Sequence, residues 1–254
     1  MSQVIKHIQA EIGKNRNYCV AAVGRVGTGK TYSAIRLATQ LQPGFTIDNI
    51  LFDIPTLLDK VYKEEVKAGE VLIFDEAGIS ASNRESYMNK FNKAMSFLLQ
   101  TWRHRQIILI ITTPNIAYID AGTRKMFDAI MECKKVVKSR KVVQVSWKFL
   151  QTNTQSGKTY YHNAKTNDME NLQLEVGKPG IKILRKYEKK KKEFTDKLYK
   201  DLKGTLIETK ELDDKREIRR CPECKSMLTR FNVTEEKMNC RQCGHKWLRE
   251  VKQA

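Results

Sequence analysis

A glycine-rich segment near the N-terminus has the residue types and spacing of a phosphate-binding loop. Residues 24–31 read GRVGTGKT and fit the pattern GxxxxGK[ST], with an apolar run before them and a helical pattern after them. The glycines allow successive backbone N–H groups to point inward, where they and the N-terminus of the next helix cradle a β-phosphate. We assign Lys30 to the β- and γ-phosphates and the Thr31 hydroxyl to Mg²⁺. The predicted nucleotide-binding residues are Gly24, Gly27, Thr28, Gly29, Lys30, Thr31 and Tyr32.

Two adjacent acidic residues follow a second apolar run, Val71–Phe74. Asp75 is predicted to hold Mg²⁺ together with Thr31. Because neighbouring strand residues face opposite ways, Glu76 is expected to point toward a water in line with the γ-phosphate and to accept its proton. This pair favours an ATPase over a kinase or a GTP switch. The alternative for Glu76 is a surface glutamate at the end of a strand.

Other polar residues are candidates for contacts to the reacting phosphate. Asn115 and Thr113 follow the apolar run Ile107–Ile111 and are predicted to contact the γ-phosphate or the attacking water; the alternative is a loop that only turns at Pro114. A cation from a neighbouring subunit is expected to stabilise the charge on the leaving phosphates. The arginines considered for it, each equally interpretable as a surface residue, are Arg84, Arg103, Arg105 and Arg124.

Four cysteines near the C-terminus have the spacing of zinc ligands. They form two CxxC pairs, Cys221 with Cys224 and Cys240 with Cys243. This spacing is typical of a zinc ribbon in which four thiolates close a structural, tetrahedral Zn²⁺ site. His245 is a fifth candidate that four sulfurs make unnecessary. Leu228 and Trp247 are expected to cover the small core, and metal binding is expected to supply the folding free energy.

The elements that must position these groups alternate between strands and helices. The expected elements are a strand at Tyr18–Val23, a helix at Lys30–Leu41, a strand at Thr46–Phe52, a helix after Pro55, a strand at Val71–Phe74, a helix at Asn89–Arg103 and a strand at Gln106–Thr112. This order predicts an α/β fold, the three-layer sandwich of P-loop NTPases with a mainly parallel sheet. After Asp128 a period of two predicts a β-hairpin extension with strands at Val136–Lys138, Val142–Phe149 and Lys158–His162. A second GKT, within Ser156–Thr159, lacks the earlier glycine and is expected to be a hairpin turn.

The predicted organisation is a P-loop ATPase domain at 1–180, a charged helical linker at 181–217 and a zinc ribbon at 218–254. For the helix, a solvated linker and a basic rod along a phosphate backbone both remain open. The N-terminus shows the spacing of an amphipathic helix and no signal-peptide core, and no apolar run approaches the ~20 residues of a membrane span. A cytoplasmic protein without membrane insertion is therefore expected, in keeping with cysteines that bind metal rather than form disulfides.

A net charge of +18 predicts a polyanionic partner, most often nucleic acid. Half of this excess lies in residues 181–254. The ribbon carries many basic residues together with the aromatic residues Phe231 and Trp247. Two roles are open for this surface, contact with DNA and docking of a protein. A second group occupies the hairpin, where a basic ridge and a protected sheet edge are alternatives. That group consists of Lys134, Lys135, Lys138, Arg140, Lys141 and Lys148, together with Trp147.

The core resembles the zonula occludens toxin-like ATPase domain of the FtsK/HerA branch of P-loop ATPases. The matching pieces are GxxxxGKTYSA, DEAG followed by an arginine, a helix ending in RHR, and a strand leading to TTPN, ID and an arginine; they cover residues 15–130. The resemblance implies a ring-forming ATPase of a virus or mobile element, with Lys30, Thr31, Asp75 and Glu76 in the roles above and Arg103 or Arg124 acting across a subunit interface. Two features differ: Thr113 and Asn115 stand where the branch often has glutamine, and no membrane segment follows the domain.

These features together predict a homo-oligomeric motor that uses ATP, Mg²⁺ and a structural Zn²⁺ to move or package DNA, with a virion or transfer-machinery protein as a further partner. One alternative is an ATPase for virion assembly or export that does not act on DNA. The other is a zinc-ribbon DNA-binding regulator that uses ATP as a switch.

Overall fold

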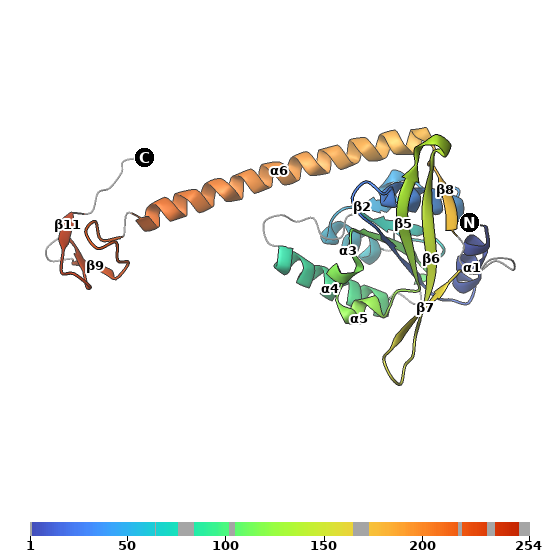
Figure 1. Cartoon of the computed structure of the whole chain (residues 1–254), viewed down its shortest axis with the longest axis horizontal. Helices are drawn as coiled ribbons and strands as arrows, with labels where there is room; N and C mark the ends of the chain where they lie inside the picture. The colour runs from blue at the N-terminus through green and yellow to red at the C-terminus, as the bar shows by residue number, and fades with distance from the viewer. Residues whose placement is uncertain are drawn as a thin grey trace. The chain divides into compact units, whose positions relative to one another are not determined.

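The computed structural model describes residues 2–63, 65–75, 84–101, 105–164, 173–217, 220–232 and 237–248. The chain divides into two compact units, residues 1–195 and residues 196–254. One helix, α6 (Ile181–Glu217), begins in the first unit and ends in the second (Figure 1). In the described part of the chain, no helix has both the length and the apolar content that a membrane span requires.

A mixed sheet of eight described strands forms the centre of the first unit, in the order β2-β3-β4-β1-β5-β6-β7, with β8 paired to β6. β1 is parallel to β4 and β5, and β3 is parallel to β2 and β4. β6 is antiparallel to β5, β7 and β8. The strands are β1 (Tyr18–Val23), β2 (Ile50–Leu51), β3 (Val71–Phe74), β4 (Ile108–Thr113), β5 (Ala129–Val137), β6 (Val142–Thr152), β7 (Thr159–Asn163) and β8 (Gln173–Gly177).

Helices cover both faces of the sheet, which confirms the predicted three-layer P-loop NTPase fold (Figure 1). Alternate residues of β1 enter two separate hydrophobic clusters because neighbouring strand residues face opposite ways. Val20 and Ala22 pack with α1 and α2, whereas Cys19 and Ala21 pack with α3 and α4. The helices are α1 (Ser2–Ile12), α2 (Lys30–Leu41), α3 (Ile54–Tyr62), α4 (Arg84–Thr101) and α5 (Ala121–Arg124).

The strand order around β1 explains where a ligand site forms. The chain leaves β1 through α2 and reaches β2 at the edge of the sheet, whereas β5 pairs with the other side of β1. In an open α/β sheet, the carboxyl end of such a strand is the position at which ligands bind. The ends of β3 and β4 lie beside it, so residues that follow all three strands share one edge.

Some expectations from the sequence are wrong in detail. The strand expected at Thr46–Phe52 is only Ile50–Leu51, because Ile47–Asn49 form a 3-10 turn before it. Trp147 was expected on a basic hairpin surface, but it is only 1% exposed. Successive side chains of β6 face opposite ways, and that of Trp147 points into the core. The second GKT does lie in the turn between β6 and β7, as expected, with Gly157 at a φ of 66°.

The second unit contains a small antiparallel sheet in the order β11-β10-β9. Its strands are β9 (Thr229–Asn232), β10 (Lys237–Cys240) and β11 (Lys246–Leu248). Met238 of β10 pairs with Phe231 on one side and with Trp247 on the other. Leu228 was expected to cover this core, but it is 62% exposed, and Met238, at 8%, takes that place.

The carboxyl group of Asp128, just before β5, makes the stability of the first unit depend on pH. Its Oδ2 accepts a hydrogen bond of 2.7 Å from the backbone N–H of Cys19, but burial dominates and raises its pKa to about 6. A raised carboxyl pKa favours the folded state at low pH, so the stabilisation is lost as pH rises through 6. Relative to Asp128→Asn, we expect the free energy of unfolding of the wild type to fall by about 1 kcal/mol between pH 5 and pH 7. Urea unfolding followed by circular dichroism measures this, and a difference that does not change with pH would contradict it.

Candidate functional site

The loop between β1 and α2 passes so close to its neighbours that two of its positions exclude a side chain. A Cβ on Gly24 would lie 2.4 Å from the carbonyl oxygen of Cys133. Gly29 has a φ of 84°, and a Cβ there would lie 2.7 Å from Cγ2 of Val143. The hydroxyl of Thr28 closes the turn by donating to the carbonyl of Arg25 at 2.8 Å. Glycine is therefore required at these two positions of the loop.

The N-terminus of α2 opens onto this loop. The first intrahelical bond runs from the N–H of Ser33 to the carbonyl of Gly29, at 2.9 Å, and no side chain caps the helix at Gly29. The amides of the first turn and the partial positive charge of the helix end are thus directed to the same place. The Nζ atom of Lys30 donates to the carbonyl of Arg25 at 3.0 Å. This arrangement suits a phosphate group.

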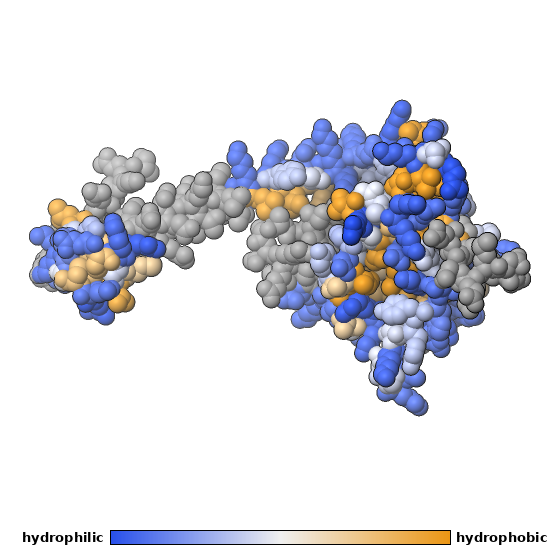
Figure 2. All heavy atoms as spheres, in the orientation of Figure 1, coloured by the Kyte–Doolittle hydropathy of each residue, from blue (hydrophilic) through white to orange (hydrophobic). Residues whose placement is uncertain are grey.

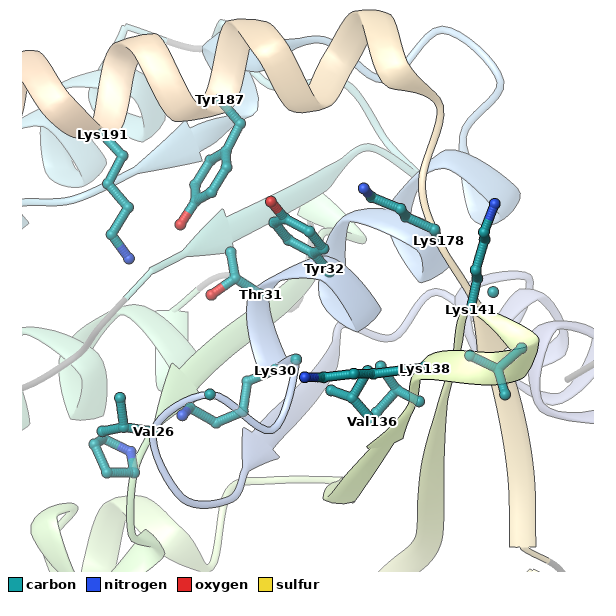
Figure 3. A pocket seen from close by; sticks show the side chains of 16 residues that line it. Val26, Lys30, Thr31, Tyr32, Val136, Lys138, Lys141, Lys178, Tyr187 and Lys191 are labelled. Atoms are coloured by element: carbon teal, nitrogen blue, oxygen red, sulfur yellow. The ribbon is translucent and has the colours of Figure 1, made fainter.

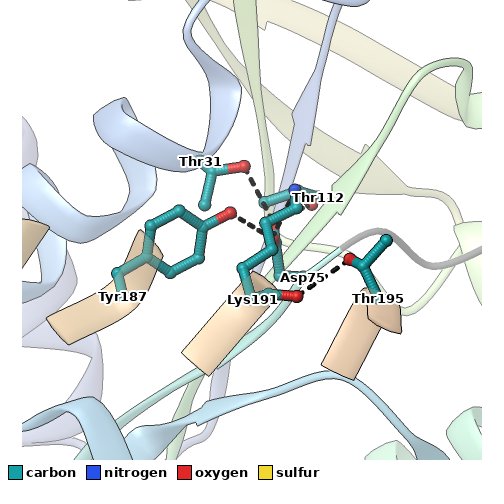
Figure 4. A network of polar contacts seen from close by, with 6 residues as sticks. All are labelled: Thr31, Asp75, Thr112, Tyr187, Lys191 and Thr195. Atoms are coloured by element: carbon teal, nitrogen blue, oxygen red, sulfur yellow. Dashed lines mark hydrogen bonds and ion pairs between the residues drawn. The ribbon is translucent and has the colours of Figure 1, made fainter. Parts of the chain in front are cut away.

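Asp75, which follows β3, is buried and at the centre of a polar network (Figure 4). Its Oδ1 accepts hydrogen bonds from the Thr31 hydroxyl at 2.7 Å and from the Thr112 hydroxyl at 2.8 Å. Thr112 belongs to β4, which lies between β1 and β3. The adjacent hydroxyl and carboxylate oxygens are the ligand types that Mg²⁺ prefers, so the donor set fits this ion.

Thr112 was missed by the sequence reasoning, which favoured Thr113 and Asn115. Its position follows from the strand register, which the sequence does not give: Ile111 pairs with Phe74, so the residues that follow them, Thr112 and Asp75, are neighbours. Thr113 faces the other way and donates to the carbonyl of Asn115 at 3.0 Å.

The first turns of α6 supply two further contacts to Asp75. The Tyr187 hydroxyl donates to Oδ2 at 2.7 Å, and the Nζ atom of Lys191 lies 3.4 Å from the same oxygen (Figure 4). Glu188, the residue after Tyr187, accepts a hydrogen bond from the Tyr32 hydroxyl at 2.5 Å, and this bond raises the pKa of Tyr32 to about 12. The charged segment expected as a linker therefore begins on the site itself.

A pocket of about 670 Å³ lies over the loop (Figure 3). This volume is within the range of small-molecule and cofactor sites. One part of its wall is apolar and is formed by Val136, Val142 and Val143 of β5 and β6, and Val26 contributes from the glycine-rich loop. The cationic side chains in its lining are Lys30, Lys138, Lys141, Lys178 and Lys191. An apolar wall beside several ammonium groups suits a ligand with a flat organic part and an anionic part, as in a nucleoside phosphate.

Two further predicted site residues, Asn115 and Arg124, do not line this pocket. Asn115 caps a 3-10 helix, Ile116–Tyr118, by accepting from the N–H of Ala117 at 2.9 Å. Arg124 ends α5 and does not line the pocket. Glu76 and Arg103 lie outside the described residues. The roles assigned to these four residues stay predictions.

The four cysteines of the second unit come together as a metal-ligand set. All four Sγ atoms lie within 4.8 Å of one another, and two pairs, Cys221–Cys243 and Cys224–Cys240, are 3.5 Å apart. A tetrahedron with Zn–S bonds of about 2.3 Å separates its sulfurs by about 3.8 Å, so the cluster fits Zn²⁺. Burial opposes ionisation of Cys240, but backbone N–H groups of Cys243 and Gln242 lower its pKa to about 6. In the same cluster, a backbone N–H of His245 lowers the pKa of Cys243, but the neighbouring thiols outweigh it and raise that pKa to about 12. His245 stacks on Trp247 at 5.8 Å and is not part of the cluster.

The fold, the glycine-rich loop and Asp75 beside it are those of a P-loop NTPase domain. Residues 20–135 match the family model of the ATPases associated with various cellular activities (AAA). A comparison with curated protein sequences gave no match.

A comparison with solved structures found several that are similar to this chain. The N-terminal domain of zonular occludens toxin from Neisseria meningitidis is 15% identical, with a TM-score of 0.33, over 60% of this chain and 96% of that one. The KaiC-like protein PH0186 from Pyrococcus horikoshii OT3 is 14% identical, with a TM-score of 0.36, over 63% and 84%. ATPases 2 and 3 of EssC from Geobacillus thermodenitrificans are 8% identical, with a TM-score of 0.34, over 73% and 45%.

Proposed function

We propose that the protein is an ATP-hydrolysing motor that moves or packages DNA for a virus or mobile genetic element. The observation that carries the ATPase part is the meeting of Thr31, Thr112 and Asp75 beside an open helix N-terminus. The motif combination that resembles the toxin-like ATPases supports the viral or mobile-element context.

In the proposed reaction, Lys30 and the first amides of α2 hold the β- and γ-phosphates. Thr31 and Asp75 hold Mg²⁺, which neutralises charge on the phosphates when it is bound. Glu76 accepts the proton of the attacking water, and Asn115 contacts the water or the γ-phosphate. Arg103 or Arg124 of a neighbouring copy stabilises the leaving phosphates, which requires a homo-oligomer, proposed here to be a ring.

The charge distribution supports DNA as the substrate. The chain has a net charge of +18. The hairpin of β5 and β6 exposes five basic residues near its tip: Lys134, Lys135, Lys138, Arg140 and Lys141. Of these, Arg140 is paired with Glu175 at 2.6 Å. In the second unit, described basic residues lie around the cysteine cluster; they are Arg220, Lys225, Arg230, Arg241 and Lys246. Such residues bind phosphate backbones and release counterions.

DNA is expected to stimulate ATP hydrolysis by about fivefold or more at 50 mM salt, and this stimulation is expected to disappear at 200 mM salt, because phosphate contacts weaken steeply with ionic strength. Steady-state ATPase assays with and without duplex and single-stranded DNA measure this. The double variant Lys134→Glu, Lys135→Glu should lose most of the stimulation. The matched control, Lys63→Glu, Lys67→Glu, also removes two exposed lysines but leaves the hairpin unchanged.

Each of the other outcomes selects another function. Turnover that ignores DNA but responds to a coat or channel protein would favour virion assembly or export. Full biological activity in a Glu76→Gln variant that no longer hydrolyses ATP would favour an ATP-switched DNA-binding regulator.

A further inference from the structure

The start of α6 is held firmly against the nucleotide-binding unit. Leu184 and Tyr187 are 2% and 3% exposed and belong to the same hydrophobic cluster as α2. The Nζ atom of Lys190 donates to the carbonyl of Ile47 at 3.0 Å and to that of Ile50 at 2.7 Å. Figure 2 shows hydrophilic residues along the outer side of this part of the helix. The helix therefore presents an inner face to the sheet and keeps its other charges in water.

Lys191 is one turn beyond Tyr187 on this inner face, and its side chain enters the pocket that also contains Lys30 (Figure 3). Its Nζ lies 3.4 Å from Asp75 Oδ2 and 5.7 Å from the centre of the Tyr187 ring. The side chain is 30% exposed, whereas that of Asp75 is fully buried. A flexible cation is thus placed at the rim of the site, beside the carboxylate that suits Mg²⁺.

We propose that Lys191 is a phosphate-binding residue of the ATP site, supplied by the same chain, which moves from Asp75 to the terminal phosphate when Mg²⁺ and ATP bind. This inference rests on the proposed ATPase function. Mg²⁺ held by Thr31 and Asp75 would take over the role of neutralising the carboxylate and would repel the nearby ammonium group. The four-carbon stem of lysine allows the ammonium to reorient, and the γ-phosphate is the anion that Mg²⁺ itself contacts.

Because Lys191 belongs to α6, the same movement couples the helix to the nucleotide. With ADP, the terminal phosphate is missing and the ammonium stays beside Asp75. With ATP, it links α6 to the γ-phosphate, while Tyr187 still holds Asp75 from the same helix. The start of α6 is therefore expected to be more strongly protected in the ATP state than in the ADP state.

Equilibrium binding of Mg²⁺–ATPγS and of Mg²⁺–ADP to the full chain tests the proposal. Lys191→Ala should weaken ATPγS binding by about tenfold or more and ADP binding by less than about twofold, because a charged contact to the terminal phosphate is lost only with ATPγS. Lys191→Arg, which keeps the cation, should restore most of the preference. The control Lys189→Ala removes a lysine two residues away, whose side chain is 82% exposed, and should behave as the wild type.

Hydrogen exchange provides a readout that does not depend on hydrolysis. In the wild type, the amides of residues 184–195 should exchange more slowly with ATPγS than with ADP, and Lys191→Ala should remove this difference. If Lys191→Ala binds ATPγS and ADP with the same affinities as Lys189→Ala does, Lys191 does not bind the terminal phosphate. This proposal would then be wrong, while the ATPase function would stand. A wild type that binds neither nucleotide would overturn the proposed function and this inference with it.

Discussion

Replacing Lys30 with alanine is expected to reduce ATP hydrolysis by about 100-fold or more and ATP affinity by about tenfold or more. Lys30 begins α2 and is held over the loop by its bond to the Arg25 carbonyl, so its ammonium lies where the open helix end would hold phosphate. Among the described residues that line the pocket, the other lysines come from different elements: the β5–β6 turn, the segment after β8, and α6.

Steady-state kinetics and binding of a fluorescent ATP analogue measure the two effects separately. Lys14→Ala serves as the control, because Lys14 is an exposed lysine whose ammonium pairs with Glu11 at 2.7 Å. Turnover in Lys30→Ala above about one tenth of the wild-type rate would show that hydrolysis does not use this loop, and the phosphate site would have to be reassigned.

Removing the metal from the cysteine cluster is expected to unfold the second unit and to leave the first unit folded. The core of the second unit is small: among its described residues, the buried ones are Cys221, Met238 and Cys240. Apolar burial of this size cannot stabilise a fold, whereas Zn²⁺ binding to such sites contributes about 10–16 kcal/mol at neutral pH. Cys240→Ser should have the same effect as a strong chelator.

Hydrogen exchange measured by mass spectrometry separates the two units in the intact chain. Amides of residues 220–232 and 237–248 should lose protection on chelation, while those of β1 and β4 should keep it. Cys133→Ser is the control, because burial raises the pKa of that thiol to about 11 and it lies outside the cluster. Metal analysis should find one zinc ion per wild-type chain, and a second unit that stays protected without metal would contradict the prediction.

Much of the first unit was predictable because its signals are local. The bounds of β1, α2 and β3 agree with the predicted ones, since each is a contiguous apolar or amphipathic run ended by glycine or an acidic residue. β2 was predicted too long and β8 was not predicted. Both are short strands whose pairing is decided by their neighbours in the sheet rather than by their own composition.

The sequence by itself determined the groups whose members are close along the chain: the glycine loop with Lys30 and Thr31, and the two CxxC turns. Only the tertiary structure decided which distant residues meet them. Thr112, Tyr187 and Lys191 reach Asp75 from positions 37, 112 and 116 residues away. The reason is physical: a turn or helix end is encoded by neighbouring residues, whereas the partners of a buried carboxylate depend on strand register and on which face of a charged helix packs against the sheet.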